Sequence, residues 1–300
     1  MKKQNLSPST VSDKPTADAL ELEAIKELLL SKFAIEKVIC FGSIINNIQN
    51  NSCFKTSENE PEVKLQNSYY LLVVPKASET LADIVIQMQL EEGLKTLANV
   101  TIIVHRMEEI NKALENGSSF FTTIYKKGTV LFDHEKEDFV VPASGTPLNK
   151  RIIKREAFWL QWFSLSEGFL RGAVFFKNDN NHNLSVYMLH QALQHCYSGM
   201  LRVLTGYRTN TNGLPRLMKL IDNIIPESSF TSFKKTPEDT RLIGLLLKGF
   251  GDARYSDKFK ITEQELSMIT TRIEEILKTA NTSCLLHIKK IKEGKTSYIA

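Results

Sequence analysis

The chain lacks long hydrophobic runs, paired cysteines and an apolar stretch near its start. No segment approaches the roughly twenty consecutive apolar residues of a membrane-spanning helix, and the opening MKKQNLSPSTVSDKPTAD has no apolar core like that of a secretory signal peptide. Its 4 cysteines, Cys40, Cys53, Cys196 and Cys284, contain no CxxC pair, which argues against a zinc knuckle or a disulfide framework. These absences predict a cytoplasmic protein without a membrane partner.

Charge is divided unevenly along the 300 residues, a length that suffices for two ordinary domains. Residues 1–147 contain 15 Lys+Arg and 20 Asp+Glu, a net −5, whereas residues 148–300 contain 23 and 14, a net +9. A basic half attracts nucleotides or nucleic acid, although a solvated positive face or a surface that meets an acidic partner gives the same count.

Residues 17–140 follow a polar, disordered tail (1–16) and show the pattern of an α/β domain. Apolar residues at helical spacing between Leu20 and Phe33 predict a helix, and the asparagine-rich stretch 46–67 predicts a long loop. Buried strands are expected over 35–41, 69–74 and 100–105, a last strand over 129–132, and further helices over 79–97, 108–114 and 120–125.

Residues 141–149 break this periodicity with prolines and a glycine and predict a linker. Only helices are expected in the second domain, residues 150–300: 150–176, 184–204, 214–225, 237–254 and 262–292. The fold class is therefore α+β, a small mixed sheet with helices followed by an all-α bundle of about five helices.

A buried strand, then Gly42 and Ser43, then a strand reading LLVV resembles the polymerase-β-like nucleotidyltransferases. In that family the Gly-Ser loop holds a triphosphate and an Asp-x-Asp pair binds the catalytic magnesium ions. Alignment on LLVV places Ser68 and Tyr70 at the two aspartate positions, and the strand VTIIVH supplies no third carboxylate. Because two-metal phosphoryl transfer requires charged oxygen ligands, we expect the fold without the chemistry.

Three interpretations of this first half stay open. A nucleotide can lie over Gly42, Ser43 and Asn46, since backbone amides after a strand bind phosphate without metal. The Gly-Ser pair is equally well explained as a tight turn. The third interpretation is an active transferase whose magnesium is held by Glu108, Glu109 or a carboxylate from residues 58–62; otherwise no cofactor or metal is expected.

In the second half, Arg254 lies at a break between two predicted helices, within GFGDARYSDKF. Its guanidinium is a rigid fork suited to phosphate, and Tyr255 beside it can stack on a base. Asp252 and Asp257 allow the competing interpretation, a buried Arg–Asp pair that only joins two helices, and the pattern alone favours this second interpretation.

Two other features of this half are assigned to packing. His190 and His195 are five residues apart and do not share a helix face, so packed histidines are expected rather than a metal site. The aromatic residues between Trp159 and Phe176 are expected in a core or a dimer interface.

The segments ARYSDKF, VYMLHQALQHCYSGMLRVLTGY and TNGLPRLMKLI resemble HEPN domains, helical bundles found beside nucleotidyltransferases. Ribonuclease members cut RNA with an Arg-x(4–6)-His motif. From Arg254 the permitted histidine positions hold Phe259, Lys260 and Ile261, and Asn212 stands where another histidine is usual. The resemblance therefore implies a HEPN domain without its ribonuclease histidine.

Together the two resemblances imply a regulatory protein of the nucleotidyltransferase/HEPN type that binds a nucleotide or RNA and is catalytically inactive in both domains. Asp252, Arg254 and Tyr255 are the expected contacts in the helical half. The HEPN resemblance further implies a homodimer through the motif-bearing helices. A partner-binding scaffold related to toxin–antitoxin systems is the remaining alternative.

Overall fold

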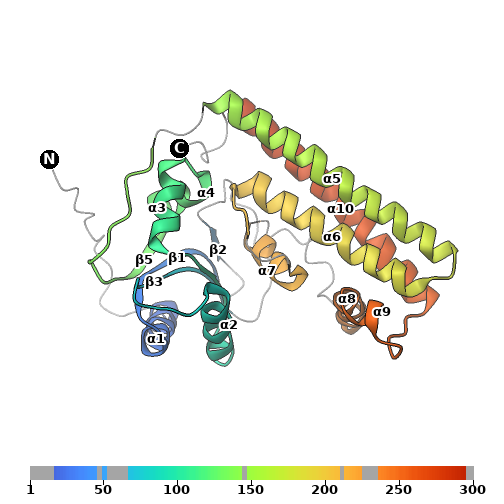
Figure 1. Cartoon of the computed structure of the whole chain (residues 1–300), viewed down its shortest axis with the longest axis horizontal. Coiled ribbons are helices and arrows are strands. Elements are labelled where there is room, and N and C mark those ends of the chain that lie inside the picture. Colours follow the sequence, from blue (N-terminus) through green and yellow to red (C-terminus); the bar gives the residue numbers. More distant parts are fainter. Residues whose placement is uncertain are drawn as a thin grey trace.

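The computed structural model describes residues 17–45, 49–52, 67–143, 147–209, 213–224 and 236–294. Within them the chain forms a sheet flanked by short helices, followed by a group of long helices (Figure 1). The expected α+β class is confirmed. In these residues no helix is both long and apolar enough to cross a lipid bilayer.

The sheet is mixed. β3 and β4 run parallel, as a crossover through a helix allows, and β1 pairs antiparallel with β2, β3 and β5. The order is β2-β1-β3-β4, with β5 beside β1. The strands are β1 (Ile35–Ile45), β2 (Gln49–Ser52), β3 (Ser68–Pro75), β4 (Asn99–Val104) and β5 (Thr129–Asp133).

Strand β3 is buried along its whole length because helices cover both faces of the sheet. Tyr69 and Leu71 point into one core, shared with α1 and α2, whereas Tyr70 and Leu72 point into the other, shared with α3 and α4. The helices on the sheet are α1 (Ala17–Lys32), α2 (Asp83–Leu94), α3 (Met107–Glu115) and α4 (Ser119–Lys127).

Two expectations for the first half were wrong. Gly42 and Ser43 do not form a loop or a turn: they lie inside β1, paired with Tyr70 and Tyr69 on one side and with β2 on the other. The stretch 46–67 is not all loop, because residues 49–52 form β2. β1 therefore extends past residue 41 and continues as a hairpin, with a pairing irregularity between Cys40 and Gly42.

Three long helices lie side by side in the second half (Figure 1). Trp159 and Tyr197 are fully buried between them, and the indole nitrogen of Trp159 donates a hydrogen bond to Asn281 Oδ1 at 2.9 Å. The helices are α5 (Leu148–Asn178), α6 (His182–Thr205), α7 (Leu214–Ile224), α8 (Pro237–Lys248), α9 (Asp252–Tyr255) and α10 (Glu263–Lys292).

The expected single helix over 237–254 is two helices in the structure. α8 ends at Lys248, and the four-residue α9 is separate from it. The bundle described here therefore has six helices, α5 to α10, where about five were expected, and the difference is the four-residue α9. The expected start of the last helix at Thr262 is confirmed, since Thr262 and Glu265 form a reciprocal capping box.

A continuous apolar core joins the sheet to the helical bundle. Tyr207, just after α6, stacks on Phe120 of α4 with ring centroids 4.3 Å apart, and its hydroxyl lies 3.1 Å from Nε2 of His105. Gly206 makes this approach possible: it has φ +83, and a Cβ there would lie 2.1 Å from Ser119 Oγ.

Arg216 of α7 makes a second link to the sheet. Its guanidinium pairs with Glu91 of α2 at 2.8 Å and donates to the carbonyl of Ile102 in β4. The exposed fractions of the two side chains are only 12% and 19%. Burial removes water from both charged groups, and the ion pair compensates each of them for this lost hydration.

We expect Arg216→Ala to lower the free energy of unfolding by about 3 kcal/mol, because Glu91 then stays partly buried without a counter-charge. Urea unfolding measures the change. The matched control is Lys95→Ala, since the Lys95–Glu92 pair is 67% and 69% exposed and such pairs contribute about 1 kcal/mol or less. Equal losses for both variants would contradict the role of Arg216.

Candidate functional site

The site is formed where the end of α8 and the short helix α9 approach α6. Gly249 allows the approach, because a Cβ at this position would lie 2.7 Å from Val186 Cγ1 and 2.9 Å from the Leu246 carbonyl oxygen. A glycine here lets the chain turn tightly against α6. Phe250 and Arg254 are thereby placed beside Tyr187 of α6.

The guanidinium of Arg254 lies among three aromatic rings. Its central carbon is 4.8 Å from the ring centroid of Tyr187, 4.4 Å from that of Phe250 and 4.7 Å from that of Tyr255. Nε donates to the carbonyl of Phe250 at 2.5 Å. Each ring face attracts the cation, by about 0.5–1 kcal/mol at an exposed site, so the side chain is held in one orientation.

This arrangement corrects the expected Arg–Asp pair. Among the described residues no carboxylate lies within ion-pairing distance of Arg254, and Asp252 and Asp257 are exposed to solvent. Tyr255 lies beside the guanidinium, as expected, and Tyr187 and Phe250 lie beside it as well. Arg254 is exposed as well, and the rings of Tyr255 and Phe250 are 79% and 48% exposed. The surface thus presents a cation and aromatic faces together.

His190 lies beneath this surface. It is 4% exposed, and its ring centroid is 5.4 Å from that of Phe250. Burial, and then the charge of Arg254, lower the pKa of His190 to about 4. The imidazole is neutral near pH 7, so it is packed, as expected, and cannot donate a proton as imidazolium there.

Chemistry-bearing residues of the sheet lie elsewhere, in the other half of the molecule (Figure 1). Ser68 and Tyr70, at the expected aspartate positions, are 4% and 3% exposed. Asn99 donates to Ser68 Oγ at 2.9 Å, and burial raises the pKa of the Tyr70 hydroxyl far above its usual value. Neither residue supplies a carboxylate.

The phosphate-binding role predicted for Gly42, Ser43 and Asn46 stays a prediction. Its geometry differs from the expected loop, since Gly42 and Ser43 lie between two paired strands. Asn46 and the carboxylates of residues 58–62 lie outside the described residues.

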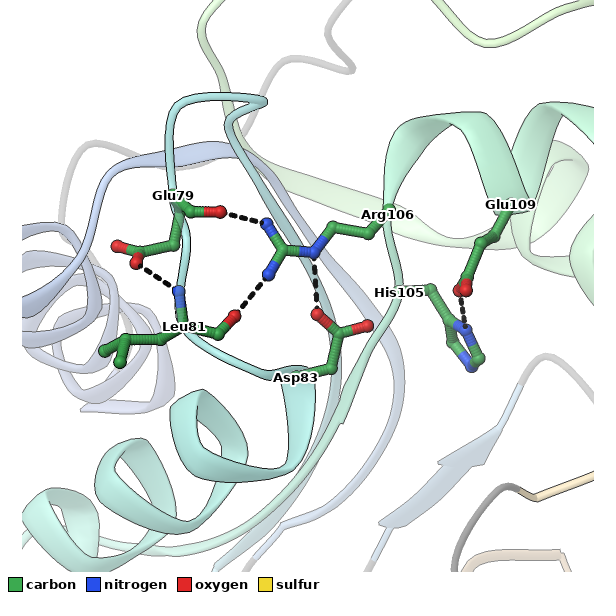
Figure 2. A network of polar contacts seen from close by, with 6 residues as sticks. All are labelled: Glu79, Leu81, Asp83, His105, Arg106 and Glu109. Carbon is green, nitrogen blue, oxygen red and sulfur yellow. Dashed lines mark hydrogen bonds and ion pairs between the residues drawn. The ribbon is translucent and has the colours of Figure 1, made fainter.

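Two polar side chains directly after β4, His105 and Arg106, make hydrogen bonds within the protein. Figure 2 shows Arg106 donating from Nε to Asp83 at 2.7 Å and from its other nitrogens to the carbonyls of Glu79 and Leu81. These hydrogen bonds hold the β3–α2 connection, which contains Glu79 and Leu81, against the end of β4. Arg106 is therefore a structural residue of this loop.

His105 bridges a carboxylate and a phenol. Its Nδ1 is 3.1 Å from Glu109 Oε2 (Figure 2), and its Nε2 faces the Tyr207 hydroxyl. Tyr207 and His105 are buried at 6% and 7% exposure, and the pKa of Tyr207 is raised to about 12, chiefly by burial. The triad joins the two parts of the chain and offers no accessible nucleophile. Within the described residues no group of His, Cys, Asp and Glu is arranged to hold a metal ion.

Sequence reasoning missed Tyr187 and Phe250 as part of the site. Phe250 could have been predicted from the sequence, because it precedes Arg254 by four residues, the spacing of neighbours on a helical turn. Tyr187 lies 67 positions before Arg254, and no sequence signal connects the two. Only the packing of α9 against α6 brings them together.

Comparison with known proteins agrees with the helical half. Residues 159–283 match the HEPN domain family. This range includes α6, α7, α8, α9 and most of α5 and α10, and so the whole aromatic and arginine site. No curated protein matches the chain.

The buried His190 generates a prediction about pH. Its folded pKa of about 4 lies below the usual 6.5, so the unfolded chain binds a proton more readily between these values. The stabilising contribution is complete above about pH 6.5 and is lost as pH falls towards 4. We expect His190→Gln to flatten the loss of unfolding free energy between pH 7 and pH 5, measured by urea titration. A slope identical to that of the unsubstituted protein would contradict this assignment.

Proposed function

We propose that the protein is an RNA-binding regulatory protein whose HEPN domain holds single-stranded RNA at Arg254. The observation that carries the proposal is the exposed guanidinium held among Tyr187, Phe250 and Tyr255 with no carboxylate partner among the described residues. A fork-shaped cation that is oriented but not neutralised is suited to bidentate contact with a phosphate.

The exposed rings favour a strand over a free nucleotide. Tyr255, at 79% exposure, and Phe250 form an open surface rather than a pocket that encloses most of a ligand. Bases of a single strand stack on such open aromatic faces while cations follow the backbone. A free nucleotide is the lesser candidate for this surface.

The proposal includes the absence of catalysis in both halves. It is supported by Ser68 and Tyr70, which supply no metal-binding carboxylate, and by the residues at 259–261, which supply no histidine to assist cleavage. His190 contacts the site but is neutral and buried beneath Phe250. The nucleotidyltransferase-like origin of the first half belongs to the same proposal.

A homodimer through the helical half is also part of the proposal. HEPN domains often dimerise, and α5 exposes the apolar side chains of Ile153, Leu160 and Phe175, each about two-thirds exposed: 64%, 65% and 65%. A second copy of the chain is the occupant that would cover them.

Fluorescence anisotropy with a labelled single-stranded RNA tests the RNA site. Tyr255→Ala is expected to weaken binding about 5- to 100-fold, because one base–ring stack is worth about 1–3 kcal/mol. The matched control is Tyr125→Ala on α4, a tyrosine 42% exposed in the other half of the chain. Equal affinities for both variants would overturn the assignment.

Arg254→Gln is expected to weaken binding and to reduce the dependence of affinity on salt by about one ion, since one phosphate contact is lost. Unchanged salt dependence would contradict a phosphate contact. If the protein binds ATP more tightly than RNA, with the same dependence on Arg254, the ligand of this site is a nucleotide and not an RNA strand.

Light scattering tests the dimer. The unsubstituted protein is expected to show the mass of two chains at micromolar concentration, and Leu160→Glu to shift it towards one. Gln161→Glu adds the same charge at the next exposed position and is expected to leave the dimer intact. A monomeric mass for the unsubstituted protein would refute the dimer without touching the RNA site.

A further inference from the structure

A second arginine cluster lies where α5 begins and α4 meets α6, at the opposite end of the bundle from α9, which contains Arg254 (Figure 1). Arg155 of α5 donates from Nη2 to Ser119 Oγ at 3.0 Å, and its Nη1 is 3.4 Å from His287 Nε2 of α10. Both partners are uncharged, since the pKa of His287 is lowered to about 3 by burial and by the neighbouring cations Arg155 and Lys290. The guanidinium therefore has hydrogen bonds but no counter-charge.

Other cations surround Arg155 instead of carboxylates. Burial and the charge of Arg151, one helical turn earlier, lower the pKa of Arg155 to about 10. Neither arginine has a carboxylate within ion-pairing distance among the described residues. Glu156, the acidic residue on this part of α5, is already paired with Lys292.

The C-terminal end of α6, which lies at the same end of the bundle, carries further positive charge and no acidic residue. Arg202 lies over the ring of Phe158, 4.3 Å from its centroid, and Arg208 follows shortly after the helix. α6 contains no Asp or Glu along its whole length. Repulsion between like charges without counter-charges raises the free energy of the folded protein. An anion bound among these cations replaces the repulsion with attraction.

We propose that Arg151, Arg155 and Lys290 form a phosphate-binding site where α4, α5 and α10 meet. The ligand is a phosphate group, which the two guanidinium groups and the ammonium neutralise. The Ser119 hydroxyl, which accepts from Arg155 and donates to the Thr205 carbonyl at 3.3 Å, positions Arg155. This site is distinct from the Arg254 surface and does not rest on the RNA proposal.

The alternative is a purely structural Arg155 that links α4, α5 and α10 through neutral hydrogen bonds. It predicts stability that is indifferent to phosphate. Arg151 separates the two explanations, because its side chain is half-exposed and makes no hydrogen bond or ion pair with the described residues. Its replacement removes charge from the site without breaking the links of Arg155.

Thermal unfolding in sodium phosphate, compared with sodium chloride at matched ionic strength, tests the site. Phosphate is expected to raise the midpoint of the full-length protein by about 3 °C or more at saturating concentration. Arg151→Gln is expected to abolish the shift while the midpoint in chloride is retained. Arg171→Gln, the same change further along α5, is the matched control and is expected to keep the shift.

Two results would overturn the site: equal midpoints in phosphate and chloride, or a shift that survives Arg151→Gln. The source of the phosphate follows from the RNA titration of the same variant. If Arg151→Gln also weakens RNA binding at least 5-fold, the phosphate belongs to a strand. If RNA affinity is unchanged while the phosphate shift is lost, the ligand is a free phosphate compound, and the site holds independently of the Arg254 surface.

Discussion

The burial of α6 is the constraint on which the rest of this structure depends. It packs between α5, α10 and α7, and its core residues from Leu189 to Leu201 are almost completely removed from water. The two ends of one rigid helix therefore fix two distant surfaces. Near its first turns Tyr187 meets Arg254, and just beyond its last turn Tyr207 reaches Phe120 and the sheet.

The two arginine clusters are stabilised in different ways. Arg254 is exposed and oriented by aromatic faces, which attract a cation without neutralising it. Arg155 is largely enclosed and held by neutral hydrogen-bond partners, so its charge is the more costly of the two. A buried carboxylate partner would have removed that cost, as Glu91 does for Arg216. Arg216, which has a carboxylate partner, links the two parts of the chain, whereas Arg155, which has none among the described residues, leaves its charge available to an anion.

Sequence periodicity predicted most of the elements, because apolar spacing follows directly from burial. The helix beginning at Thr262 and the buried strand Tyr69–Val74 are of this kind. Sequence periodicity failed where strand pairing decides the local structure. Gly42 and Ser43 have the local signature of a turn, yet pairing with β2 and β3 extends β1 through them. At the site, Arg254 was found from its own neighbours, whereas Tyr187 depends on tertiary packing that local sequence does not encode. The ion pair was expected because Asp252 is close in sequence, but three rings compete for the same guanidinium.

The separation of the two clusters limits what a single ligand can do. Tyr187 and Arg202 are 15 residues apart on α6, which at about 1.5 Å per residue is about 22 Å. A mononucleotide is too short to span this distance, whereas a strand of several nucleotides can place a base on Tyr255 and a phosphate near Arg155. The geometry of α6 therefore couples the two surfaces only for a polymer, and leaves them independent for any small phosphate compound.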